Sequence, residues 1–284
     1  MMVMIGLAVV SASVVGGFLM SGGNLAVLIH PSELLIIGGA AVGAFLISNS
    51  MKVIKGTFSS LLGTFSGGSH GKEDYVNALM LLNGVFYKIR QQGLVSIESD
   101  VDEPERSALF TDYPSILKNK RAILLVTDTL RTVMTTTIAT HELEALLDTE
   151  LETYHEEIMA PSKAVNTVAD GLPGLGIVAA VLGVVLTMGK ISEPPEVLGN
   201  SIGAALVGTF LGVLLCYGFV GPLGKSIESS AIEKMAYLNV LKVALISFLG
   251  GSAPKVAVEF GRRVVPPNVQ PSFAEVEEAM RKKK

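Results

Sequence analysis

Four stretches of the chain are almost free of charge and long enough to cross a membrane. They cover residues 1–29, 34–51, 171–189 and 197–224, and the last two contain no Asp, Glu, Lys, Arg or His. A helix of about 20 apolar residues spans a bilayer. The pattern therefore predicts an all-α, polytopic membrane protein with four transmembrane helices.

The long segment between the second and third stretches follows a different pattern. Apolar residues recur there at helical spacing over residues 75–91, 122–137 and 141–159, with charged residues between them. Gly93 is placed to end the first of these helices. Because no alternating strand pattern competes, we expect this insert to be entirely helical.

These patterns divide the chain into four consecutive segments. A Gly- and Ser-rich link is expected at residues 66–71, near the start of the insert. The tail has helical periodicity over residues 225–248, a break at Gly250 and Gly251, and a short helix near residues 255–262. The expected segments are transmembrane helices 1 and 2 (1–51), a cytoplasmic helical domain (52–170), transmembrane helices 3 and 4 (171–224), and C-terminal cytoplasmic helices with a tail (225–284).

Composition and charge agree with this topology. The chain is 49% hydrophobic and 17% charged, with a mean hydropathy of +0.52, which is typical of membrane proteins. Lys52 and Lys55 follow the second stretch and Lys225 follows the fourth, whereas the loop at residues 22–33 has no Lys or Arg. The positive-inside rule then places both termini and the insert in the cytoplasm. The first stretch lacks the basic start of a signal peptide, so we expect it to be retained.

The motifs that suggest catalysis do not have the required spacing. His141 and Glu142 resemble the start of a zinc-protease helix, but Ala145 occupies the position of the second histidine. The glycine-rich turn at residues 171–176 begins a membrane stretch, whereas a phosphate-binding loop follows a strand. The one cysteine, Cys216, allows no disulfide within the chain. We therefore expect a protein that is not an enzyme, with no cofactor, no metal site and no nucleic-acid partner.

Glycines recur four residues apart in the fourth stretch, at positions 199 and 203 and at positions 208 and 212. Small residues at this spacing let membrane helices approach closely. Packing within the chain and assembly around a central partner both explain the pattern, and both remain open.

The third and fourth stretches each contain one proline, Pro173 and Pro222. A proline inside a membrane helix leaves a carbonyl without its usual donor and loosens that turn. Ion pathways through membranes normally contain an ionisable group, and these two stretches contain none. If the protein conducts protons, a partner chain must supply the acid.

Short motifs spread along the chain are, taken together and in order, similar to a known family. The motifs are residues 173–177, 203–212 with Thr209, 217–222, 90–94 followed by Glu98, and 254–262 with Pro266 and 271–273. With these motifs the chain resembles, over essentially its full length, the MotA family of flagellar motor stator subunits. That family is part of the wider MotA/TolQ/ExbB proton channel family.

The resemblance implies a homopentamer in the lipid of the bacterial inner membrane, around a dimer of the single-span partner MotB, whose Asp carries the ion. It implies that ion flow rotates the ring and applies torque to the rotor protein FliG, which serves flagellar rotation, motility and chemotaxis. By resemblance, Arg90 and Glu98 contact the rotor. An ion pair within the subunit, or solvated helix ends, is the alternative for these two residues. The residues implied in the ion path and coupling are Pro173, Ala180, Thr209, Tyr217 and Pro222.

Ala180 bears on the coupling ion. It lies seven residues after Pro173, so both residues share one face of a helix. By resemblance, sodium-driven members have a threonine at the position of Ala180, whereas Thr209 is shared by both ion types. Sodium needs several oxygen ligands, and alanine offers none, so we expect proton drive. The alternative is that Ala180 is a packing residue and sodium finds its ligands elsewhere.

Two other functional classes compete with the stator hypothesis. ExbB- and TolQ-like energy-coupling subunits also surround a single-span partner, but they typically have three membrane spans, and the four stretches here disfavour them. A small-solute transporter would have inverted repeats and polar binding groups at the membrane midplane. Neither feature is evident in the sequence.

Overall fold

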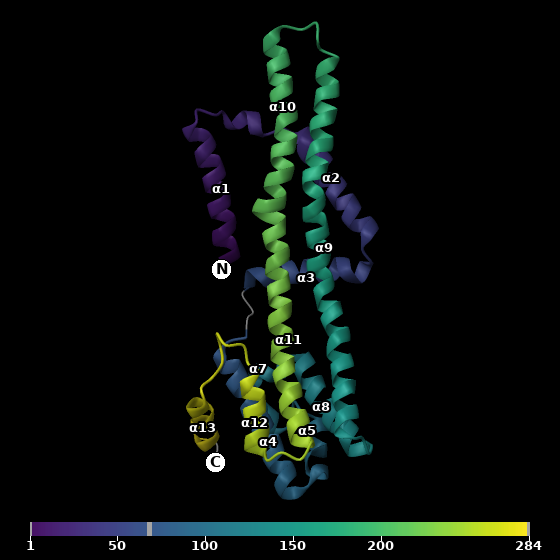
Figure 1. Cartoon of the computed structure of the whole chain (residues 1–284), viewed down its shortest axis with the longest axis vertical. Coiled ribbons are helices and arrows are strands. Elements are labelled where there is room, and N and C mark those ends of the chain that lie inside the picture. The colour runs from purple at the N-terminus through teal and green to yellow at the C-terminus, as the bar shows by residue number, and fades with distance from the viewer. Residues whose placement is uncertain (1, 67–69, 283–284) are drawn as a thin grey trace. The chain divides into compact units, whose positions relative to one another are not determined.

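The computed structural model describes residues 2–66 and 70–282, so residues 67–69 of the expected flexible link lie outside the described residues. All elements within these ranges are helices, as Figure 1 shows. Four helical segments are long and apolar enough to cross a membrane: Met2–Met20, Leu25–Ser48, Thr140–Met188 and Pro195–Leu249. The all-α class and the four expected membrane spans are confirmed.

The chain forms two compact units, each built from separate parts of the sequence. The first contains residues 1–68 and 157–230, and the second contains residues 69–156 and 231–284. Two long helices, α9 (Thr140–Met188) and α11 (Gly221–Leu249), contribute residues to both units. The four-segment division expected from the sequence follows chain order and stays a prediction.

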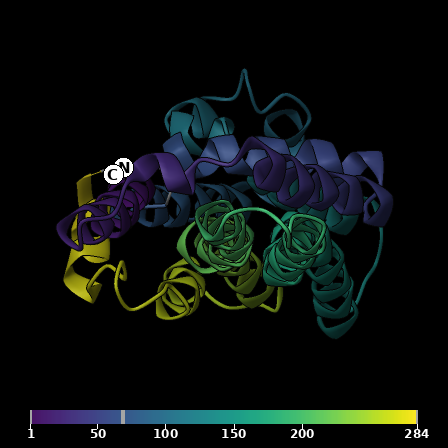
Figure 2. The same ribbon diagram turned by 90° about the horizontal axis from the view of Figure 1, so that it is seen from above.

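The first unit is built around two long helices that lie side by side. Figure 2 shows the second half of α9 next to α10 (Pro195–Leu214), with the N-terminal helices along one side of this pair. Helix α10 continues through the π-helix η3 (Leu215–Val220) into α11. The N-terminal helices are α1 (Met2–Met20), η1 (Leu25–Leu28), α2 (Pro31–Ser48) and α3 (Met51–Ser66).

The core of this first unit is small. Its one cluster of buried side chains among the described residues contains Ile37, Ala41, Ala169, Leu172, Ala179 and Cys216. Helix α1 has no buried residue at all, although it is apolar throughout. A helix that is apolar on every side and buries no residue fully within its own chain is suited to contact lipid or other subunits.

The structure joins two elements that the sequence pattern separated. The helix expected at residues 141–159 and the membrane stretch at 171–189 are one continuous helix, α9, which contains Pro161 and Pro173. A proline removes one intrahelical hydrogen bond and bends the helix, but the neighbouring turns retain their own bonds. Around the first proline, the Ser162 hydroxyl donates a buried hydrogen bond of 2.9 Å to the carbonyl of Gly224, which ties α9 to α11.

The second unit has a larger core of aliphatic and aromatic side chains. Phe86 stacks on Phe248 with ring centroids 4.2 Å apart, and Tyr75, Phe110 and Tyr237 are also buried. The elements are α4 (Lys72–Gln92), η2 (Leu94–Ile97), α5 (Glu98–Asp102), α6 (Ala108–Thr111), α7 (Pro114–Leu117), α8 (Lys120–Thr135), α12 (Pro254–Arg263) and α13 (Phe273–Lys282), with parts of α9 and α11.

The expected helix ends of this unit are largely confirmed. Helix α4 ends at Gln92, and Gly93 follows with φ of +84°, a left-handed conformation that glycine adopts without strain. The break after α11 is confirmed as well, since Gly251 has φ of +100°. In the first unit, helix α3 was not expected, because the sequence pattern assigned no element directly after the second membrane stretch.

Candidate functional site

The central feature of the first unit is a backbone contact between α9 and α10. A Cβ atom placed on Gly212 would lie 2.6 Å from the carbonyl oxygen of Leu172, and one on Gly176 would lie 2.8 Å from the carbonyl oxygen of Gly208. Real side chains do not tolerate such distances, so glycine is needed at both positions. Packing within the chain therefore explains Gly208 and Gly212. A Cβ atom placed on Gly199 or Gly203 would have no contact within 4 Å among the described residues outside its own helical backbone.

The structure brings two of the expected ion-path residues to this contact. The backbone nitrogen of Ala180 lies 3.2 Å from the Cβ position of Gly208, and the Cα of Thr209 lies 3.3 Å from that of Gly176. Pro173 lies three residues before Gly176 on α9. Ala180, Thr209 and Pro173 are all half-buried. The α9–α10 contact thus gathers small side chains and one hydroxyl.

Tyr217 and Pro222 lie at a wider turn of the same helix pair. The backbone N–H of Gly221 donates to the carbonyl of Cys216, five residues earlier, within the π-helical turn η3. This widening precedes Pro222, whose ring would otherwise collide with the carbonyl four residues before it. The Tyr217 side chain is 74% exposed. The sequence predicted a loosened turn here, and in the structure this turn is a π-helix.

Two carboxylates lie close to the uncharged stretches. Helix α2 begins at Pro31, so Glu33 lies in its first turn, where it is buried and accepts a hydrogen bond of 2.6 Å from the Ser32 hydroxyl. The sequence interpretation placed Glu33 outside the second span, although a proline at the first helical position signals this start. Asp170 is exposed on α9, three residues before Pro173.

The expected rotor contacts lie at one reversal of the chain in the second unit. We call residues 90–98 the α4–α5 corner. Arg90 is in the last turn of α4 and Glu98 begins α5, and both side chains are exposed. Among the described residues neither forms an ion pair, so an internal Arg90–Glu98 bridge does not occur there. Val95 between them is 74% exposed.

A buried polar contact braces this corner from below. The Lys88 Nζ lies 2.6 Å from Asp100 Oδ2, and the Ser107 hydroxyl donates to Asp100 Oδ1 at 2.7 Å. Ile97 is fully buried beside them. Sequence reasoning missed this brace, because Lys88 and Asp100 are twelve residues apart on different helices and belong to no recognisable motif.

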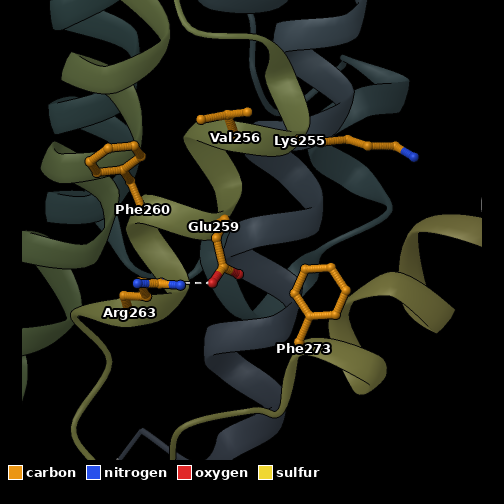
Figure 3. A pocket seen from close by; sticks show the side chains of 6 residues that line it. All are labelled: Lys255, Val256, Glu259, Phe260, Arg263 and Phe273. Atoms are coloured by element: carbon orange, nitrogen blue, oxygen red, sulfur yellow. Dashed lines mark hydrogen bonds and ion pairs between the residues drawn. The ribbon is translucent and has the colours of Figure 1, made fainter.

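A groove on α12 forms a second exposed feature of this unit. Figure 3 shows Lys255, Val256, Glu259, Phe260, Arg263 and Phe273 around a hollow of about 420 Å³. Glu259 accepts hydrogen bonds from Arg262 at 2.6 and 2.7 Å and from Arg263 at 2.9 Å. These bonds, first among them those from Arg262, lower the pKa of Glu259 to about 2. The groove therefore combines a fixed carboxylate with exposed phenylalanines.

Comparisons with known proteins agree with this architecture. Residues 4–93 match the family described as "Motility protein A N-terminal", and residues 120–237 match the "MotA/TolQ/ExbB proton channel family". Structures of MotAB are similar to this fold. That of C. jejuni has a TM-score of 0.78 at 19% identity, covering 95% of this chain and 98% of that one. The flagellar MotAB stator complex of Bacillus subtilis has 0.70 at 19%, covering 90% and 92%.

Relatives of known sequence extend over almost the whole chain. Motility protein A of Salmonella typhimurium is 41% identical over 99% of this chain and 95% of its own length, and that of Escherichia coli is 42% identical over the same shares. Chemotaxis protein LafT of Vibrio parahaemolyticus is 32% identical over 96% of both. These full-length relatives do not favour the ExbB- or TolQ-like alternative. The chain therefore belongs to the motility protein A family of flagellar stator subunits.

Proposed function

We propose that this subunit, with a MotB-like single-span partner, forms a proton-conducting complex in the bacterial inner membrane and applies torque to the rotor protein FliG. The observation that carries the proposal is the α9–α10 contact. Two membrane stretches without any ionisable group meet there through glycine, with Ala180 and Thr209 beside the contact. Such a wall offers a path but no proton carrier, so the carboxylate belongs to the partner.

The proposed coupling uses the loosened turns of these helices. An aspartate of the partner takes up and releases the proton, with Thr209 as the hydroxyl beside its path. Pro173 and the widened turn before Pro222 leave backbone carbonyls that are held less firmly than those of a regular helix. These turns give α9 and the α10–α11 segment positions where they bend as the partner's charge changes. Bending there is the proposed source of ring movement.

The proposed assembly is a ring of five subunits with both termini in the cytoplasm. Helix α1 buries none of its residues within its own chain, although its apolar side chains need cover. Neighbouring subunits and membrane lipid supply that cover in the ring. The pentamer follows from the family resemblance, and the orientation follows from Lys52, Lys55 and Lys225.

The α4–α5 corner is the proposed contact with the rotor. It presents a cation, an exposed valine and an anion within nine residues, and neither Arg90 nor Glu98 forms an ion pair with another described residue. The Lys88–Asp100 brace holds the corner in place. Charged groups at such a rim set partner choice and association rate more than total affinity.

The proposal is tested by proton flux in vesicles. The full chain alone, reconstituted in liposomes with an imposed potential, is expected to leave the internal pH unchanged, because the two stretches that meet at the α9–α10 contact hold no Asp, Glu, Lys, Arg or His. With its MotB-like partner it is expected to acidify the lumen, weakly while any plug of the partner closes the path. Replacing the partner's membrane aspartate by asparagine is the matched control and should abolish the flux. Robust flux through vesicles that hold only this chain would contradict the proposal.

A further inference from the structure

The second unit contains a cavity with an unusual concentration of positive charge. Its volume is about 520 Å³, within the range of roughly 300–1,000 Å³ typical of small-molecule sites. Five of the residues that line it carry or can accept a proton as cations: His70, Lys118, Lys120, Arg121 and Lys234. Among the described residues that line the cavity, none is an Asp or Glu.

The lysines of this cavity have no partners among the described residues. Lys118, Lys120 and Lys234 form no ion pair there, whereas Lys72, Lys88 and Lys242 of the same unit each bind a carboxylate: Lys72 binds Glu275 at 3.1 Å, Lys88 binds Asp100 at 2.6 Å and Lys242 binds Asp148 at 2.5 Å. Ammonium groups gathered around one hollow repel each other, and an anion placed between them relieves that repulsion.

Two further nitrogen atoms in the cavity wall are buried and have no hydrogen-bond partner among residues 2–66 and 70–282. The first is Nε of Arg121, whose Nη2 binds Glu150 at 2.8 Å and whose guanidinium lies 4.7 Å from the ring centroid of Tyr154. The second is Nδ1 of His70. Buried polar atoms are nearly always paired, so these two nitrogens leave polar groups beside the cavity that no described residue satisfies.

The position of the His70 ring is fixed by its neighbours. It stacks on Tyr237 with centroids 4.1 Å apart, and its Nε2 lies 3.5 Å from the amide nitrogen of Asn119. Burial lowers the pKa of His70, against the raising effects of Asp74 and Glu233. The ring is thus held in one orientation at the cavity wall.

The first turn of α8 adds to the same potential. Asn119 caps this sixteen-residue helix by accepting a hydrogen bond of 3.2 Å from the N–H of Ala122. Lys120 and Arg121 are its first two residues, so their side chains and the positive end of the helix dipole act on the same place.

We propose that this cavity binds a phosphate group, either of a small soluble molecule or of an anionic lipid headgroup. A phosphate offers several acceptor oxygens and up to two negative charges, which matches donors contributed by residues 118–121 at the junction of α7 and α8, by α11 and by His70 just before α4. Lys120 and Lys234 come from separate elements and close the site from two directions. Nothing in the proton path or the α4–α5 corner is required for this binding.

Calorimetry on the full chain in nanodiscs of phosphatidylcholine tests the proposal, with inorganic phosphate titrated against chloride at matched ionic strength. Saturable binding of one phosphate per chain is expected. The Lys120→Gln/Lys234→Gln double variant should raise Kd at least tenfold. The control Lys255→Gln removes another lysine of the same unit that forms no ion pair with a described residue, and it should change Kd less than twofold. Circular dichroism checks that the variants remain helical.

A second arm separates the two sources of phosphate. In nanodiscs that contain phosphatidic acid, loss of inorganic phosphate binding assigns the site to the lipid headgroup, whereas unchanged binding assigns it to a soluble phosphate. The proposal is overturned if the wild-type chain binds neither inorganic phosphate nor phosphatidic acid saturably. It is also overturned if Lys255→Gln weakens phosphate binding as much as the double variant does.

Discussion

At the scale of single residues, the α9–α10 contact depends on glycines, which have no side chain to keep the two helices apart. Gly212→Ala would place a methyl group 2.6 Å from the Leu172 carbonyl oxygen and 2.8 Å from the Cα of Gly176. Backbone atoms cannot move aside as a flexible side chain does, so the helices must separate. We expect a cost of about 1–3 kcal/mol, typical of overpacking, and swimming slowed severalfold. The melting temperature of the purified complex and the swimming speed measure the two effects.

A matched glycine on the same helix provides the control. Gly203 has nothing within 4 Å of its Cβ position, so Gly203→Ala should leave the melting temperature of the purified complex unchanged. If Gly212→Ala and Gly203→Ala lower the melting temperature and the swimming speed by the same amount, the close contact does not limit function. Sequence spacing alone predicted equal importance for both glycine pairs, because it cannot tell which helix face meets a neighbour.

Ala180 makes a prediction about the coupling ion. Its backbone lies at the α9–α10 contact, and its methyl group offers no oxygen to a sodium ion. Swimming speed is therefore expected to stay flat across external sodium concentrations at constant pH, and to collapse when a protonophore is added. Sodium-driven relatives would respond in the opposite way. A speed that rises and saturates with sodium would overturn proton drive.

At the scale of elements, the sequence predicted helices well where periodicity and terminators coincide. Gly93 and Gly251 both adopt positive φ where helix ends were expected. The pattern failed where a polar segment and an apolar segment share one helix, because Pro161 lies inside α9 without ending it. It predicted a loosened turn at Pro222 but did not specify that this turn is π-helical.

Helix α12 gives a prediction on stability and pH. Glu259 has a pKa of about 2 in the fold, below its ordinary value of 4.5, because of Arg262 and Arg263. A lowered carboxyl pKa stabilises the fold above about pH 4.5, and this contribution is lost as the pH falls towards 2. Glu259→Gln should therefore cost about 1.5–3 kcal/mol at neutral pH and little near pH 2. Melting followed by circular dichroism at several pH values measures the difference.

The control for this variant is an exposed ion pair of the same unit. Glu277 binds Arg281 at 2.8 Å, and the two side chains are 42% and 76% exposed. Pairs of this kind contribute roughly 0–1 kcal/mol, so Glu277→Gln should change the melting temperature little at any pH. If both variants behave alike, the hydrogen bonds of Glu259 add no stability beyond that of a surface charge.

At the scale of the whole molecule, the sequence predicted the class of the protein better than its internal bracing. The uncharged stretches were enough to predict four membrane spans, and the motifs in their order were enough to predict the family. The Lys88–Asp100 brace and the cavity around Lys120 depend on residues that lie far apart in the sequence or belong to no motif. Their partners become visible only when the helices are packed, because polar side chains carry no periodic signal of their contacts.

The α4–α5 corner connects this molecule to its proposed rotor. Arg90→Glu should impair swimming strongly while membrane insertion and assembly with the partner stay normal, because Arg90 is exposed and supports no contact of the core. A matching charge reversal on FliG should restore part of the motility. Asp100→Asn provides a contrast, since it breaks the brace beneath the corner and no rotor charge should rescue it. Normal swimming of an Arg90→Glu/Glu98→Lys double variant would remove both residues from the rotor contact, because a docking face cannot work equally well with its charges exchanged.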